Sequence, residues 1–182
     1  MKHRISILIL PVLIIIIISG CSTDSVVTVK QETRDNEIAA ALNKTFNESF
    51  PQLQITTNTD CNIDDSIKSP VSGNVKITGW VTVEEQAGRT NWSLDFGFAD
   101  YKTSNSSLTY IIFKGVLTYA GYSNEYTSSF TMKSGNLSSK GKVESLDFDY
   151  TCTCELTVTF NKYTGKTNIT GNVCGRIINF NF

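Results

Sequence analysis

Reactive side chains of most kinds are scarce in this chain, and its chemistry falls mainly to cysteine. The only histidine among the 182 residues is His3. From residue 4 onward the chain therefore has no imidazole, which excludes Ser-His-Asp and Cys-His nucleophile systems, His-ligated zinc and an unperturbed imidazole base. The sequence predicts a protein that is not an enzyme and that has no catalytic residue, no cofactor and no metal.

Four cysteines lie in the body of the chain: Cys61, Cys152, Cys154 and Cys174. In a chain that leaves the cytoplasm an even number of cysteines indicates disulfides, and four allow three connectivities. Cys152 and Cys154 lie two residues apart on a predicted strand, about 6–7 Å from each other, and a direct bond between them is strained. A hairpin predicted at 164–165 brings Cys174 close to Cys154. We therefore favour Cys154–Cys174, which leaves Cys61–Cys152 as the second pair. A four-thiolate zinc site is the alternative, although Cys-x-Cys is a poor match to the usual Cys-x2-Cys knuckle.

Carboxylates offer two weaker possibilities. Asp147 and Asp149 share one face of a predicted strand about 6–7 Å apart, near the spacing used in glycoside hydrolysis. Solvated acids on a strand face are far commoner, so they receive no catalytic role. Asp60 begins a run of oxygen-bearing side chains at alternate positions, but the positions where a calcium loop needs Gly and Glu hold other residues. Residues 58–70 are therefore predicted to be a solvated loop pinned by a disulfide.

Aromatic residues supply the candidate binding surface. Trp80 is out of phase with the valines around it, so its ring is expected on the outer face of a strand, and Tyr110 and Tyr122 are expected there as well. Exposed rings can stack on a sugar or on a partner protein. The alternative is that the outer face is itself covered, because one face of the sheet must take a helix. Trp92 belongs to an apolar series and is expected in the core.

Alternation of apolar and polar residues predicts the sheet that positions these side chains. The longest alternating run reaches from Leu146 to Phe160, and another apolar series begins at Tyr126. Period-two alternation over fifteen residues is typical of a half-buried antiparallel strand. The sequence predicts a mainly β fold, a curled antiparallel meander or barrel-like sheet of about seven or eight strands that starts near residue 74.

One amphipathic helix is expected before the sheet, over about 36–50. Apolar residues at i, i+4 spacing form one stripe from Ile38 to Phe50, Asp35 can cap the start, and Pro51 ends the helix. This stripe is expected to pack on the sheet.

Glycine spacing predicts how the sheet bends. Pairs of the form Gly-x5-Gly recur, and the second glycine of each pair is expected inside a strand, where it permits a bulge or a sharp curl. The last segment shows a shift in apolar phase, which one bulge near Cys174–Gly175 would reconcile. The pairs are Gly73/Gly79, Gly115/Gly121, Gly135/Gly141 and Gly165/Gly171.

The first residues have the layout of an export signal. A basic stretch at 2–4 precedes an aliphatic run at 5–18, which is shorter than the roughly 20 residues needed to span a bilayer. The segment ends in Ile-Ser-Gly-Cys at 18–21, which resembles the lipobox of bacterial lipoproteins. The resemblance implies cleavage before Cys21, acylation of its thiol with a chain such as palmitate, and attachment to a membrane. An ordinary cleaved signal with an incidental cysteine is the alternative.

The expected organisation has three parts: a signal peptide (1–20), the lipidated Cys21 with a flexible tether (21–34), and one mainly β domain (35–182). From residue 21 onward the chain has 14 basic and 17 acidic residues. This mild balance gives no case for a nucleic-acid partner or for a polybasic lipid-binding patch. Ser22 stands where an aspartate is linked to inner-membrane retention, which favours the outer membrane or the cell surface.

The sequence thus predicts a non-enzymatic, lipid-anchored envelope or surface lipoprotein with a binding or structural role, whose partner is a protein, a glycan or an apolar ligand. A helix followed by a long antiparallel sheet on a lipoprotein is similar in outline to the LolA/LolB-type lipid carriers. That resemblance implies an alternative, a carrier that holds an apolar ligand between sheet and helix. A carrier predicts a pocket beside Phe46 and Phe50, whereas a binding module predicts a filled core and an outer aromatic patch around Trp80.

Overall fold

A single antiparallel sheet of eight strands forms most of the protein, with one helix before it. The computed structural model describes residues 24–53, 60–106, 109–144 and 146–182. Its strands follow one another in chain order, and β1 is not paired with β8, so the sheet is an open meander. The predicted mainly β fold with an N-terminal helix is confirmed. The elements are α1 (Asp24–Ser49), η1 (Phe50–Gln52), β1 (Cys61–Lys68), β2 (Ser72–Glu84), η2 (Glu85–Ala87), β3 (Arg89–Ser106), β4 (Thr109–Ser123), β5 (Thr127–Val143), β6 (Leu146–Asn161), β7 (Lys166–Val173) and β8 (Arg176–Asn181).

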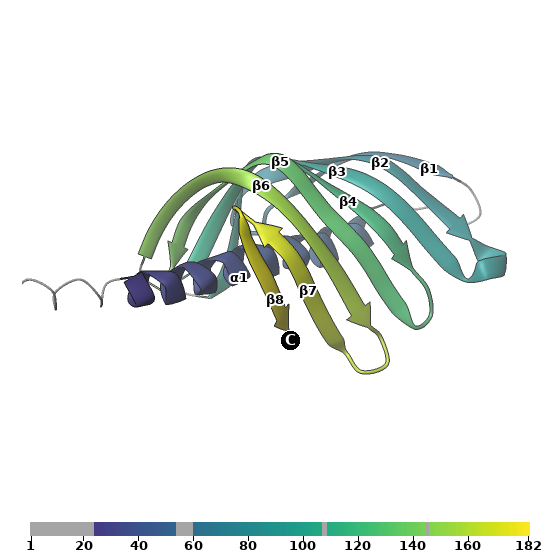
Figure 1. Cartoon of the computed structure of the whole chain (residues 1–182). Helices are drawn as coiled ribbons and strands as arrows, with labels where there is room; N and C mark the ends of the chain where they lie inside the picture. Colours follow the sequence, from purple (N-terminus) through teal and green to yellow (C-terminus); the bar gives the residue numbers. More distant parts are fainter. Residues whose placement is uncertain (1–23, 54–59, 107–108, 145) are drawn as a thin grey trace, which may run out of the picture.

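The sheet curls around α1, which lies along its concave side (Figure 1). The predicted stripe of the helix faces the sheet, with Ile38, Leu42 and Phe46 buried. The hydroxyl of Tyr119 donates a hydrogen bond to the Leu42 carbonyl at 3.0 Å and so ties the helix to β4. Helix and concave face therefore form one core, because each buries the apolar face of the other.

The helix is longer than its apolar stripe. It begins at Asp24, so that residues 24–34, predicted to belong to a flexible tether, are helical. Asp35 is not a cap either: its carboxylate is buried in the structure beside arginine side chains. The first turns carry no apolar stripe, and periodicity alone could not reveal them. The predicted signal peptide, 1–20, and the lipidation site Cys21 lie outside the described residues.

The sheet also begins earlier than predicted. The segment 61–68 is strand β1, so the solvated loop predicted over 58–70 is wrong for these residues; positions 54–59 lie outside the described residues. Ile63 and Ile67 are the two residues of β1 buried in the core, and Cys61 packs partly against it. Two apolar residues among polar ones make an alternation too short to identify an edge strand from sequence.

Glycines inside the strands permit the tight curl, as the spacing predicts. Gly79 and Gly171 have φ of +137° and +140°. A Cβ at Gly79 would lie 2.1 Å from the Ser93 carbonyl oxygen, and one at Gly171 would lie 2.2 Å from that of Glu155. Only glycine allows neighbouring strands to approach this closely with this backbone.

The phase shift near the C-terminus has a different cause from the predicted bulge. Cys174 and Gly175 both have positive φ, 53° and 81°, and they form a two-residue turn between Val173 and Arg176, which are paired. Two left-handed residues are the geometry of a tight hairpin turn. The sequence lacks the Asn-Gly or Asp-Gly signature of such turns, so the hairpin between β7 and β8 was not predicted.

Candidate binding surfaces on the outer face and the rim

The two ends of the curled sheet differ, and they are named here by their elements. Antiparallel pairing places the turns β2–β3, β4–β5 and β6–β7 at one end, which we call the rim. The opposite end holds the start of α1 and the start of β6, and we call it the anchor end (Figure 1).

A shallow groove of about 450 Å³ crosses the outer face of β2, β3 and β4 near the rim. We call it the Trp80 groove. Trp80 is 45% exposed there, and the groove also contains Tyr122, so the structure brings together two of the three predicted surface aromatics. The lining residues are Trp80, Thr82, Glu84, Arg89, Asn91, Gly121 and Tyr122.

Planar polar side chains of the groove are fixed to one another. The Arg89 guanidinium lies over the Tyr122 ring, 3.9 Å from its centroid. Arg89 Nε donates to Asn91 Oδ1 at 2.7 Å, and Asn91 Nδ2 donates to Glu84 Oε1 at 2.9 Å. The strand register places Asn91 beside Tyr122, so these groups are held in one row across the strands beside the Trp80 ring.

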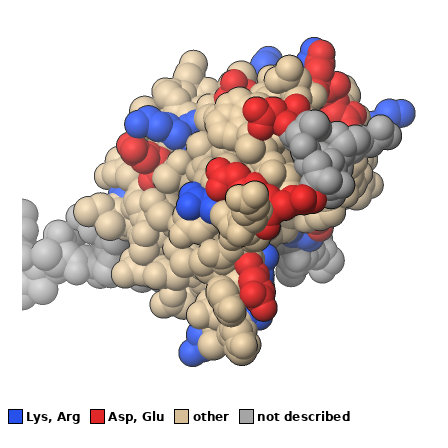
Figure 2. Space-filling model, turned by 90° about the vertical axis from the view of Figure 1, so that its right-hand side faces the viewer, with Lys and Arg blue, Asp and Glu red and all other residues tan. Residues whose placement is uncertain are grey.

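Acidic side chains gather over the middle of the rim end in Figure 2. Glu48, Glu84, Glu85 and Glu125 are exposed in this part of the molecule. Arg89 is the one cation among the residues that line the Trp80 groove, and it is engaged with Tyr122 and Asn91. Such a surface suits a neutral ligand better than a polyanion.

Tyr110, the third predicted surface aromatic, lies elsewhere. It is twelve positions from Tyr122 along β4, about 40 Å at the rise of an extended strand. The Lys102 ammonium lies 4.2 Å from the centroid of its ring. The three predicted aromatics therefore do not form one surface.

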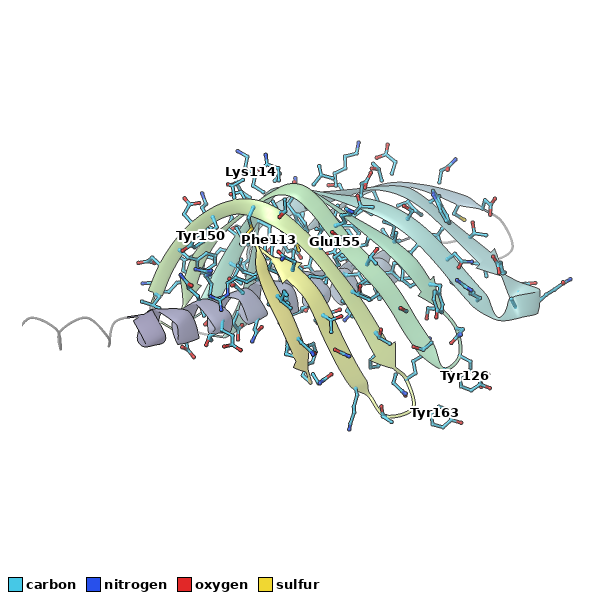
Figure 3. The ribbon with its side chains drawn as sticks, in the orientation of Figure 1. Phe113, Lys114, Tyr126, Tyr150, Glu155 and Tyr163 are labelled. Carbon is cyan, nitrogen blue, oxygen red and sulfur yellow. A yellow bond between two sulfur atoms is a disulfide. The ribbon has the colours of Figure 1, made fainter. Side chains whose placement is uncertain are left out.

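A pair of tyrosines on the rim was missed by the sequence analysis. The rings of Tyr126 and Tyr163 stack with centroids 6.1 Å apart and planes 10° apart, and they are 55% and 83% exposed (Figure 3). Tyr126 was expected to begin the apolar series of a strand, but it lies in the β4–β5 turn. The backbone N–H of Lys162 donates to the Tyr126 carbonyl at 2.9 Å and joins the two turns.

The two tyrosines share a local sequence pattern that could have revealed them. Each follows an asparagine by two residues: Asn124 Oδ1 accepts from the N–H of Tyr126 at 2.9 Å, and Asn161 Oδ1 accepts from that of Tyr163 at 2.9 Å. Asparagine commonly stabilises turns in this way. The repeated Asn-x-Tyr pattern gives the two turns the same pair of hydrogen bonds from backbone N–H groups to the asparagine, and both rings are exposed.

The disulfide joins Cys152 to Cys174, whose Cα atoms are 4.9 Å apart. The predicted pairs Cys154–Cys174 and Cys61–Cys152 are therefore wrong. Cys154 pairs in register with Val173, and Cys174 comes one residue later, where its N–H donates to the Thr153 carbonyl at 3.0 Å. The left-handed backbone at Cys174 directs its side chain to Cys152, away from Cys154.

The other two cysteines of the β domain, Cys154 and Cys61, lie on different strands. Cys154 is buried in the sheet, and burial raises the pKa of its thiol to about 12. Cys61, at the start of β1, packs partly against the core and takes no part in the Cys152–Cys174 bond. No group of three or more His, Cys, Asp or Glu side chains within the described residues is placed to hold a metal ion.

The remaining acids sit in two very different settings. Asp147 and Asp149 are exposed on β6, and Asp147 Oδ1 lies 3.7 Å from Lys142 Nζ. Asp35, by contrast, is fully buried at the anchor end between Arg34 Nη2 at 2.7 Å and Arg176 Nε at 3.2 Å. Residues 35 and 176 are far apart in the chain, and sequence reasoning did not connect them.

Around Phe46 the space between helix and sheet is filled by aromatic rings. Phe46 lies within 6.1 Å, centroid to centroid, of five other rings, which come from η1, β3, β4 and β5. The pocket that remains beside Phe46 and Phe50 has a volume of about 140 Å³. Small-molecule sites commonly measure about 300–1,000 Å³.

Comparisons with known proteins add no relative. No protein-family model matches the chain, and neither a curated protein nor a solved structure matches it at a significant level. Within the part of the chain that the structure describes, no helix has both the length and the apolar character required to cross a membrane.

Proposed function

We propose that this protein is an exported lipoprotein, attached to a membrane through Cys21, whose β domain binds a glycan in the Trp80 groove without catalysing a reaction. The lipobox-like residues 18–21 support the attachment, and Ser22 favours the outer membrane or the cell surface. The observation that carries the binding role is the exposed Trp80 ring beside a fixed row of planar polar side chains.

A glycan suits this surface because sugars have two kinds of face. The C–H face of a pyranose stacks on an aromatic ring, and its hydroxyls bond to planar amide, carboxylate and guanidinium groups. Asn91, Glu84 and Arg89 already hold one another, so little side-chain freedom is lost on binding. A protein partner would need a larger apolar centre than one exposed indole.

The alternative function is that of a carrier of an apolar ligand. The small space between helix and sheet argues against it. The pocket of about 140 Å³ beside Phe46 and Phe50 is too small for a lipid chain, and the rings of Tyr119 and Phe130 pack directly against Phe46. A carrier would also be expected to purify with bound lipid.

Tryptophan fluorescence tests the binding role. Trp92 is buried and Trp80 is exposed, so a glycan in the groove should change the emission of Trp80 alone. The processed protein is titrated with soluble envelope glycans, starting with peptidoglycan fragments. Trp80→Ala also removes this emission, so affinities of the variants are compared by isothermal titration calorimetry, in which Trp80→Ala should weaken binding at least about 30-fold, the effect of losing a central aromatic contact. Val116→Ala is the matched control, because Val116 is exposed on the same sheet but does not line the groove. Equal affinity in both variants would refute the assignment.

A further inference from the structure

Three apolar side chains of β6 are left uncovered at the anchor end. Leu146 and Tyr150 are each 39% exposed, and Phe148 is partly buried against the core. We call them the apolar strip. The register contributes to their exposure: β7 pairs with β6 only from Cys154 onward, so the first half of β6 has a neighbouring strand on one side alone, which is β5.

The apolar strip is fixed to the first part of α1. The Arg34 guanidinium lies over the Tyr150 ring at 4.2 Å, and the rings of Phe148 and Tyr150 stack with centroids 6.3 Å apart. On β5 their partners are the small residues Gly141 and Ser139. The contact between Arg34 and Tyr150 therefore sets the position of the apolar strip relative to the helix.

From the contact between Arg34 and Tyr150, helix α1 and strand β6 extend almost equally far toward the anchor end. From Arg34 the helix continues ten residues back to Asp24, about 15 Å. From Tyr150 the strand continues four residues back to Leu146, about 13 Å. Figure 1 shows the start of α1 and the start of β6 at the same end of the molecule. Cys21 precedes Asp24 by three residues in the sequence, a length of chain that spans at most about 11 Å.

We infer that the anchor end is seated on the lipid bilayer, with the apolar strip in the interfacial layer beside the acylated Cys21, and that the rim with its Trp80 groove faces away from the membrane. The inference rests on the lipidation proposed above. A tether of fourteen residues would leave the body free to turn, with an average reach of roughly 20 Å. A helix that begins at Asp24 removes most of that freedom.

The chemistry of this end fits a neutral lipid interface. Tyrosine and aliphatic residues are favoured where headgroups meet acyl chains. On the outer face of the same hairpin Lys140 pairs in register with Asp149, and Lys142 with Asp147, so these four charges cancel, and exposed Glu144 in the turn leaves one negative charge. The anchor end should therefore contact a bilayer of zwitterionic phosphatidylcholine, and this contact should not require anionic lipid.

Quenching by brominated acyl chains tests the orientation. The processed protein, from the acylated Cys21 onward, is reconstituted in phosphatidylcholine vesicles that contain brominated lipid. The substitution Trp80→Phe removes the exposed tryptophan, so that only the buried Trp92 contributes background emission. Added to this variant, Tyr150→Trp should lose about half of its new emission, because an interfacial residue lies within about 5–10 Å of the headgroup–acyl boundary. Tyr163→Trp on the rim is the matched control and should lose none. Equal quenching of the two, or none at Tyr150→Trp, overturns the inference.

Hydrogen exchange supplies a readout that does not depend on those substitutions. Amides of residues 146–153 should exchange more slowly in vesicle-bound wild-type protein than in soluble Cys21→Ser protein. Unchanged exchange contradicts seating, and slower exchange without quenching means that protein, rather than lipid, covers the apolar strip. Mass spectrometry of the same preparation separates the two proposals: an unlipidated Cys21 refutes the proposed anchoring, whereas a lipidated Cys21 without quenching refutes the seating alone.

Discussion

The anchor end and the rim are held by opposite kinds of contact. At the anchor end, Asp35 meets Arg176, and Cys152 is bonded to Cys174 across 22 positions of sequence. At the rim, Asn161 holds its turn through backbone groups two and three residues away. Long-range contacts fix the position of α1 on the sheet, and local contacts shape the surface that faces solvent.

This difference indicates which substitutions each end can tolerate. Removing a buried charge leaves its partners without compensation, so changes at the anchor end should affect the whole fold. Changes in an exposed turn should alter the local surface and leave the core intact. Three measurements probe this contrast, in addition to the binding and orientation experiments above.

The largest effect is expected at the buried carboxylate. Asp35→Ala leaves Arg34 and Arg176 without their shared partner and should lower the free energy of unfolding by about 3 kcal/mol. Urea unfolding of the processed protein measures this loss. The control is Lys133→Ala, which breaks the exposed Lys133–Glu155 pair at 3.2 Å and should cost less than about 1 kcal/mol. Similar costs in the two variants would show that the anchor end does not depend on its buried charges.

The second effect concerns the thiol beside the disulfide of the anchor end. Burial raises the pKa of Cys154 from 9.0 to about 12, so above pH 9 the folded protein keeps a proton that the unfolded chain releases. Stability is therefore lost as pH rises, by up to about 1.4 kcal/mol per pH unit.

Unfolding of wild type and Cys154→Ala between pH 8 and 10 measures this dependence; tyrosines titrate toward the upper end of the range, but they do so in both proteins. The slope should be shallower in Cys154→Ala, whatever the cost of the cavity it leaves. Parallel slopes would mean that the thiol is accessible to water in the folded protein.

The smallest effect on stability is expected at the rim. Asn161→Ala removes the acceptor of two backbone N–H groups and should cost about 1 kcal/mol. Contacts between the rings of Tyr126 and Tyr163, measured by NMR, should weaken because the turn no longer holds Tyr163 in place. Asn168→Ala, an exposed asparagine on β7, should change neither quantity. An intact ring pair in Asn161→Ala would show that stacking, and not the asparagine, orders the turns.

Much of the fold was predictable because it follows from local rules. Alternation identified the long strands and placed Trp92 inside and Trp80 outside, and both placements are confirmed. Glycine spacing indicated where the strands curl, and Gly79 and Gly171 serve that purpose. The edge strand β1 was not predicted, because it has too few apolar residues to show the alternation of a strand.

The candidate sites were less predictable, because they depend on which residues meet. Because both residues have even numbers, the alternation of side chains along a strand placed Tyr110 and Tyr122 on the same face. Alternation could not show that, of these two, only Tyr122 lies near Trp80. The Tyr126–Tyr163 pair requires two turns to lie side by side, which follows from the pairing of β5 with β6.

By itself, the sequence determined which face of each strand turns toward the helix, since successive side chains of a strand point to opposite sides. Only the tertiary structure decided the register and the long-range partners. The disulfide shows why: a single left-handed residue, Cys174, moves the bond from Cys154 to Cys152. The conformation of that residue depends on how β7 and β8 pair, and alternation along the chain carries no information about it.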